Sequence, residues 1–176
     1  IRKQVLHNRL GTRIAEIDAQ AFWRGCGPCL GIARAGLHKL LVQQASGLHV
    51  RFGVTVQALR QHEDHVSVEL SDGGKEAYDF IVGADGIRSS VRRLEFGHSE
   101  PSFRGQAGWR FTVRRPAGLD DWTAFLGRGS AFLMLPISED WAYCYADQSS
   151  DRAATDSAQG GVERLREHFA DYAPPV

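Results

Sequence analysis

The strongest chemical pattern in the sequence is the run GADGIRSSVR at residues 83–92, which follows a short apolar stretch typical of a buried strand. Ser89 lies at the start of a short predicted helix, where free N–H groups and the helix dipole favour an anion or a cofactor hydroxyl. Asp85 can accept from such hydroxyls or orient Arg92, and Gly86 allows close approach to the backbone. The same residues also fit an ordinary strand–turn–helix with Ser89 as cap and Arg92 on the surface.

A second pattern is the tetrapeptide Cys26-Gly27-Pro28-Cys29, which is also the active-site tetrapeptide of thioredoxin. A thiol–disulfide oxidoreductase is therefore an alternative function. That chemistry needs the first cysteine at a helix N-terminus, whereas the sequence around Cys26 predicts a loop. A zinc site needs a second close pair of ligands, which Cys144 and scattered histidines do not supply. We therefore predict no metal site.

A third pattern is the alternation in residues 107–114, where Arg110 lies on the face opposite Trp109 and Phe111. Tyr143 lies in a second alternating run. An aromatic acid would bind well to an arginine beside an aromatic side chain, so Arg110 and Tyr143 are candidate substrate contacts. The alternative is that Trp109 and Phe111 are core residues and Arg110 forms a salt bridge at the rim.

These side chains must be positioned by an α/β fold of the α+β type. Period-two alternation and turn residues predict strands, and apolar spacing of three and four predicts helices. We expect a hairpin over 1–18, a loop at 19–30, helices at 34–46, 89–94 and 161–172, an antiparallel β-meander at 54–79, a short strand at 79–84, and strands at 107–114, 130–135 and 141–146. Residues 1–18 and 105–148 are expected to share one sheet.

In this order, the motifs resemble the FAD-dependent aromatic hydroxylases, the para-hydroxybenzoate hydroxylase-like class A flavoprotein monooxygenases. The resemblance is nearest to the salicylate and 3-hydroxybenzoate hydroxylase branch. The family motif D-G-x-x-S-x-x-R is matched by Asp85, Gly86, Ser89 and Arg92. About fifty residues upstream the family has an Arg-x-x-Leu helix start, and downstream a glycine and a Trp-Arg strand, matched by Arg34, Leu37, Gly105, Trp109 and Arg110.

The resemblance implies an enzyme in which NAD(P)H reduces FAD and the reduced flavin activates oxygen to hydroxylate a small aromatic substrate. It implies that Arg34 contacts FAD near its ribityl or phosphate part, although a helix-surface arginine would look the same. Asp85 and Gly86 would contact the flavin side, with Ser89 in the same motif. Arg92 would support this motif or contact the nicotinamide cofactor. No residue is singled out as catalytic.

The resemblance also implies that the chain is an internal piece of the enzyme. The family's GxGxxG unit would precede Ile1 and its Gly-Asp motif would follow Val176. We therefore expect the isolated chain to be inactive and to bind no FAD tightly. The expected domains are a substrate-domain hairpin and loop (1–30), a partial FAD-binding domain with helix, meander and Asp-Gly motif (31–92), and a substrate-binding domain with a mixed or antiparallel sheet (93–176).

Composition narrows the remaining function classes. The chain has 176 residues, 43% apolar and 24% charged, with a formal net charge of zero. This excludes a disordered chain and gives no basic excess for nucleic acid, and no apolar stretch is long enough for a membrane span. Three cysteines and no visible signal peptide predict a cytoplasmic protein. A non-catalytic binding domain stays a further alternative, and the oligomeric state is left open.

Overall fold

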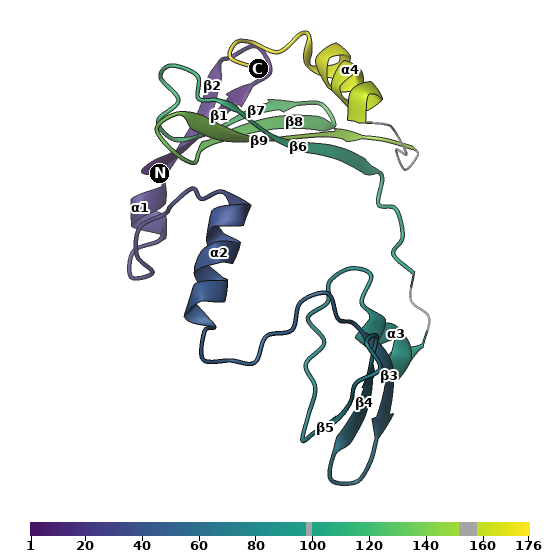
Figure 1. Cartoon of the computed structure of the whole chain (residues 1–176). Helices are drawn as coiled ribbons and strands as arrows, with labels where there is room; N and C mark the ends of the chain where they lie inside the picture. Colours follow the sequence, from purple (N-terminus) through teal and green to yellow (C-terminus); the bar gives the residue numbers. More distant parts are fainter. Residues whose placement is uncertain (98–99, 152–157) are drawn as a thin grey trace. The chain divides into compact units, whose positions relative to one another are not determined.

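The computed structural model describes residues 1–97, 100–151 and 158–176 (Figure 1). The chain forms two compact units. Unit 1 contains residues 1–43 and 103–176, and unit 2 contains residues 44–102. Unit 1 is therefore built from both ends of the chain, and unit 2 is a continuous insertion between them.

Unit 1 contains a six-stranded mixed sheet with the order β2-β1-β7-β8-β9-β6. β1 pairs with β7 in parallel, and the other neighbours are antiparallel. The expectation that residues 1–18 share a sheet with 105–148 is confirmed. The strands are β1 (Lys3–Asn8), β2 (Arg13–Asp18), β6 (Gln106–Arg114), β7 (Trp122–Gly127), β8 (Ser130–Pro136) and β9 (Trp141–Ser149).

The strand β7 was not predicted from the sequence. Its residues Ala124 and Phe125 are adjacent in the chain, and both are buried, because their side chains point to opposite faces of a central strand. A strand covered on both faces loses the apolar–polar alternation that marks a half-exposed strand. The pattern that revealed β6 and β9 was therefore missing here.

One face of this sheet carries the core of unit 1 beneath helix α4 (Ala158–Phe169), as Figure 1 shows. Phe169 contacts Phe132 at a ring-centroid distance of 5.2 Å and Tyr172 at 4.8 Å. Trp109 and Phe111 pack against the same cluster, as the core interpretation of β6 expected. Strand alternation then places Arg110 on the opposite face of the sheet.

Unit 2 contains the predicted antiparallel meander, formed by β3 (Val56–Gln61), β4 (Val66–Leu70) and β5 (Lys75–Tyr78). Helix α3 (Ser90–Phe96) follows it, at the place where a short helix was expected. The turn between β4 and β5 has Gly73 at φ 85°, a conformation that favours glycine. Arg51 pairs with Asp72 and with Glu76 across this turn.

The predicted strand at 79–84 is wrong. These residues belong to no sheet, and Phe80 and Val82 are 76% and 74% exposed. A strand exists only where a neighbouring strand completes its hydrogen bonds, and no described strand pairs with this segment. The apolar run is typical of a buried strand, but this segment is exposed and the described residues supply no partner strand for it.

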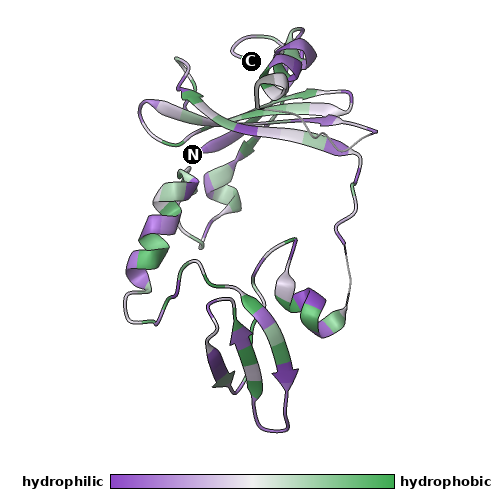
Figure 2. Ribbon diagram, turned by 45° about the vertical axis from the view of Figure 1, so that its right-hand side comes forward, coloured by the Kyte–Doolittle hydropathy of each residue, from purple (hydrophilic) through white to green (hydrophobic). Residues whose placement is uncertain are grey.

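Two further elements lie between β2 and the meander. The expected loop at 19–30 begins with one helical turn, α1 (Ala19–Phe22), capped by the Asp18 side chain, which accepts from the Ala21 N–H. Helix α2 (Arg34–Gln44) confirms the helix predicted at 34–46. The apolar side of this helix is not buried, since Leu37, Leu40 and Leu41 are all exposed. Figure 2 shows apolar residues of the helix as green bands.

Candidate functional site

The Asp-Gly motif in unit 2 is organised around the Asp85 carboxylate. One oxygen, Oδ1, accepts from the Ser89 hydroxyl. The other, Oδ2, accepts from the Ser90 N–H at 2.6 Å, the Ser90 hydroxyl at 2.8 Å and the Val91 N–H at 3.2 Å. Asp85 therefore ties the turn to the first residues of α3.

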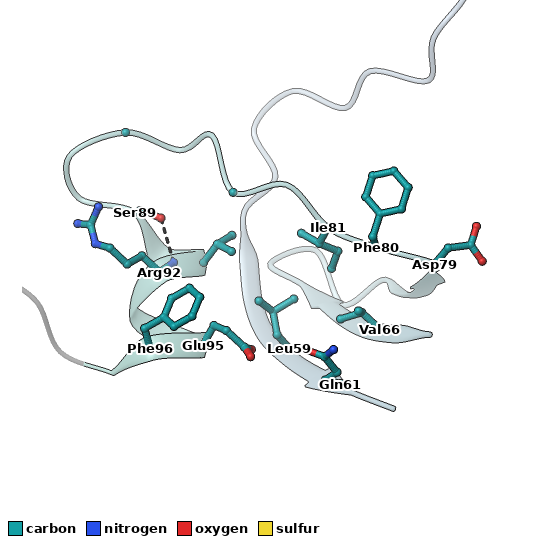
Figure 3. Close-up of a pocket in the computed structure, with 13 residues that line it drawn as sticks. Leu59, Gln61, Val66, Asp79, Phe80, Ile81, Ser89, Arg92, Glu95 and Phe96 are labelled. Carbon is teal, nitrogen blue, oxygen red and sulfur yellow. Dashed lines mark hydrogen bonds between the residues drawn. The ribbon is translucent and has the colours of Figure 1, made fainter. Parts of the chain in front are cut away.

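This arrangement corrects the expectation of free N–H groups at the start of α3. Ser89 Oγ accepts from the Arg92 N–H at 3.0 Å, as drawn in Figure 3, while the N–H groups of Ser90 and Val91 are bonded to Asp85. The carboxylate of Asp85 is thus the anion at this helix terminus, where negative charge is stabilising. Ser89 is the predicted cap, and it is buried.

Hydrogen bonding also fixes the charge of Asp85. Its pKa lies well below the ordinary value for an aspartate, first because Ser89 donates to it and then because Ser90 and the Val91 N–H also do. A carboxylate that stays ionised repels phosphate groups and attracts hydroxyl groups. Its Oδ1 accepts one described hydrogen bond and retains a second lone pair.

The glycines on either side of Asp85 shape the turn in different ways. Gly86 has φ 83°, in the left-handed region, and a Cβ built there would have no heavy atom within 4 Å. The backbone at Gly86 is therefore open to a ligand. A Cβ at Gly83 would lie 2.9 Å from Cγ1 of Val91, so Gly83 allows the segment to pack closely on α3.

A cavity of about 550 Å³ lies between the meander, the segment 79–86 and α3 (Figure 3). Its walls include Leu59, Val66 and Ile81, and polar side chains of Gln61, Asp79 and Glu95 stand at its rim. Ser89 and Gly86 also line it. The Asp-Gly turn therefore borders an apolar hollow rather than a flat surface.

The two arginines predicted to contact the cofactor have different settings. Arg92 donates from Nη2 to the Ile87 carbonyl at 2.5 Å, so it braces the turn through the backbone rather than through Asp85. Arg34 is the exposed first residue of α2 and belongs to unit 1. Its contribution to a site shared with Asp85 stays a prediction.

The predicted substrate residues lie together on the face of the sheet opposite α4. Arg110 on β6 is opposite Tyr145 on β9, and its guanidinium carbon lies 4.7 Å from the centre of that ring. Tyr143 is two residues along β9, opposite Thr112. No carboxylate of the described residues lies within salt-bridge distance of Arg110, which contradicts the salt-bridge alternative for this residue.

Tyr145 was not among the predicted site residues, although it shares a strand face with Tyr143. Its hydrogen bond with Asp147 raises the pKa of Tyr145, with burial as a smaller cause in the same direction. Asp147 and Arg110 therefore approach the same ring. Period-two spacing placed Tyr145 on this face, and only the strand register identified it as the partner of Arg110.

The CGPC segment lacks the geometry of a thiol–disulfide active site. Cys26 follows α1 in a turn, and its N–H donates to the Trp23 carbonyl at 2.9 Å. Helix α2 begins only at Arg34, so neither cysteine of the motif stands at a helix N-terminus, where a reactive thiolate would be stabilised. Nothing in the described part of the chain supports the thiol–disulfide oxidoreductase alternative.

The third cysteine, Cys144, differs from this pair because it lies in the core of unit 1 and is 1% exposed. Burial raises its pKa to about 11. We expect a disulfide reagent at pH 8 to modify two thiols of the reduced native chain quickly, because Cys144 is both inaccessible and largely protonated. Absorbance of the released thiolate measures this, before and after denaturation.

A Cys144→Ala variant is the control for this labelling. It should release the same two equivalents in the native state and no third equivalent on unfolding. Three thiols reacting at one rate in the native protein would contradict the burial of Cys144.

Across residues 1–97, 100–151 and 158–176, no three His, Cys, Asp or Glu side chains gather in a way that could hold a metal ion. Within the same ranges, no helix has the length and apolarity needed to cross a membrane.

The sheet with α4 on one face and the meander with its Asp-Gly turn lie largely within the part of the chain that matches one protein family. Residues 7–170 match the FAD_binding_3 family, described as an FAD binding domain. The chain belongs to this family, and its relatives include FAD-dependent monooxygenases and hydroxylases.

Individual relatives agree with this assignment. A 2-heptyl-3-hydroxy-4(1H)-quinolone synthase of Pseudomonas aeruginosa is 33% identical over 152 residues, 81% of this chain and 38% of that protein. An FAD-dependent urate hydroxylase of Klebsiella pneumoniae is 28% identical over 156 residues, 86% of this chain and 40% of that protein. The chain thus spans about two fifths of the curated relatives it matches.

Solved structures give the same result. Klebsiella pneumoniae HpxO, crystallised with FAD and uric acid, has a TM-score of 0.86 and 26% identity, over 99% of this chain and 46% of that one. A salicylate hydroxylase complex has a TM-score of 0.74 over 96% of this chain and 46% of its own. Its identity of 18% shows a shared fold only.

Proposed function

We propose that this chain forms the middle of an FAD-dependent monooxygenase that uses NAD(P)H to hydroxylate a small aromatic substrate. The observation that carries this proposal is the match over nearly the whole chain to a structure that holds FAD and uric acid. The division into an FAD-binding part at 31–92 and substrate-binding parts at 1–30 and 93–176 belongs to this proposal. No observation favours a non-catalytic binding domain.

The Asp-Gly turn fits a cofactor that carries hydroxyl groups. The backbone at Gly86 is open, and the ionised Asp85 has a free lone pair on Oδ1. Asp85 and Gly86 would therefore face the ribityl or ribose part of FAD rather than its phosphates. Ser89 and Arg92 hold the turn, and Arg34 would meet the cofactor from α2. Bound flavin would supply the electron transfer and oxygen activation.

The open face of the sheet in unit 1 would bind the substrate ring. Arg110 stacks on Tyr145 and has no acidic partner among the described side chains, so its N–H groups are available to an acceptor on the substrate. Tyr143 offers a second polar contact on the same face. A stacked guanidinium is held in place at little further entropic cost, so these residues would orient the ring.

The test uses the full-length enzyme that contains this chain. Copurified flavin and substrate-dependent NAD(P)H oxidation would be measured with a 2-alkylquinolone, urate and salicylate as trial substrates. Arg110→Gln should raise KM for the accepted substrate roughly tenfold or more, because a hydrogen bond to a charged donor is lost. Flavin content should be unchanged.

Arg114→Gln is the matched control, because Arg114 lies four residues further along β6 on the same face and stacks on Trp141 at 4.6 Å. It should leave KM within about twofold of the parent, as expected for an exposed substitution. An enzyme without flavin would refute the proposed function. A flavoenzyme in which both variants behave alike would refute only the role of Arg110.

A further inference from the structure

A separate cavity of about 410 Å³ lies in unit 1 beside the C-terminal end of α4. It is distinct from the open sheet face and from the Asp-Gly turn. Three of its lining side chains are basic or become cationic, one is acidic and two carry hydroxyl groups. These side chains are Arg9, Arg128, His168, Asp171, Ser130 and Tyr172, and Gly127 also lines the cavity.

The topology of the sheet brings the two arginines together. β1 and β7 run parallel, and Asn8 at the end of β1 pairs with Leu126 near the end of β7. The turns that follow these strands therefore emerge at the same edge of the sheet. Arg9 is the first residue after β1, and Arg128 the first after β7.

The floor of the cavity is fixed by the segment that follows α4. The hydroxyl groups of Tyr172 and Ser130 are hydrogen bonded at 2.7 Å, and the Ala173 N–H donates to the Arg9 carbonyl at 2.8 Å. A Cβ on Gly127 would lie 2.2 Å from the Tyr172 hydroxyl oxygen, so this contact requires glycine. The cavity is therefore a built feature of the fold.

Charge in this cavity is unbalanced. Among the residues that the structure describes, no carboxylate lies within 4.0 Å of the Arg9 or Arg128 guanidinium, and no cation pairs with Asp171. Two positive charges face one negative charge and the end of α4, whose dipole is equivalent to about half a negative charge. The cavity is therefore net positive even with His168 neutral.

We propose that this cavity binds a phosphate group, either the free ion or a small phosphomonoester. Two guanidinium groups match the oxygens of a phosphate. Of the Ser130 and Tyr172 hydroxyls, the one that accepts their mutual hydrogen bond keeps its own proton to donate to a third oxygen. Asp171 accepts only from a protonated oxygen, which hydrogen phosphate carries and which a monoester carries at and below its second pKa of about 6. Sulfate has no such proton, so Asp171 repels it.

The experiment is a calorimetric titration of the full chain at pH 6 with inorganic phosphate, phenyl phosphate and sulfate. We expect saturable binding of phosphate and weaker binding of sulfate. Arg9→Ala and Arg128→Ala should each lower phosphate affinity at least tenfold, in line with the loss of charge-assisted hydrogen bonds. Arg24→Ala, an exposed arginine in the loop after α1, is the matched control and should stay within twofold.

Asp171→Asn tests the basis of selectivity. It removes the repulsion, so sulfate affinity should rise at least fivefold while Arg128→Ala still lowers it. Tighter binding of phenyl phosphate would assign the site to monoesters, and tighter binding of inorganic phosphate to the free ion. The proposal is overturned if neither saturates, if binding survives both arginine substitutions, or if the parent chain binds sulfate as tightly as phosphate.

Discussion

Replacing Asp85 by alanine in the full-length enzyme is expected to lower flavin affinity, or the rate of NAD(P)H-dependent flavin reduction, roughly ten- to a hundredfold. The carboxylate accepts four hydrogen bonds from Ser89, Ser90 and the Val91 N–H, so its loss releases the turn as well as one acceptor for the cofactor. Flavin titration and stopped-flow reduction measure both quantities, and circular dichroism checks the fold.

Gly86→Val should have a larger effect than Asp85→Ala. At φ 83° a β-branched residue is strained, and its side chain would also fill the open space above the backbone. Glu63→Ala is the control, because Glu63 is an exposed carboxylate in the turn between β3 and β4, outside the Asp85 network and the cavity. If Asp85→Ala keeps the flavin content and reduction rate of the parent, the role assigned to this motif is wrong.

Phe169→Ala is expected to lower the free energy of unfolding of unit 1 by about 3–5 kcal/mol. Phe169 is 4% exposed and contacts the rings of Trp109, Phe132 and Tyr172, so truncation leaves a cavity between α4 and the sheet. Domains are stable by about 5–15 kcal/mol in total, so this is a large part of the stability. Urea unfolding followed by tryptophan fluorescence measures the change.

The matched control is Phe22→Ala in helix α1. Phe22 is 72% exposed, and such substitutions usually change stability by less than about 0.5 kcal/mol. Equal destabilisation by the two substitutions would show that the α4 contact does not carry the stability of unit 1.

The Asp-Gly motif shows which structural features a local sequence pattern is able to predict. Residue types and spacing were enough to predict the turn, the cap at Ser89 and the helix after it, because capping depends on neighbours within a few residues. Sequence could not show that Asp85 satisfies the N–H groups at the helix start. Both a free helix terminus and a capped one have the same residues, and only the side-chain positions distinguish them.

The strands of the sheet in unit 1 likewise include some that the sequence pattern predicted and one that it missed. Alternation predicted β1, β2, β6, β8 and β9, since each has one face that is more exposed. It missed β7, which has buried residues on both faces. A short apolar run, rather than alternation, led to the strand predicted at 79–84, which has no pairing partner in the described chain. A single strand's residues report its burial, but its hydrogen bonds come from segments that are distant in sequence.

Sequence by itself determined the family, the Asp-Gly turn, the meander and the face on which Arg110 lies. The family follows from a resemblance that rests on motifs along the whole chain, and the other three features follow from residue spacing within one element or one turn. Tertiary structure alone decided that Arg110 stacks on Tyr145, that Arg92 bonds to the Ile87 carbonyl, and that two turns place Arg9 beside Arg128. Strand register and parallel pairing join residues up to about 120 positions apart, and no local pattern encodes such pairings.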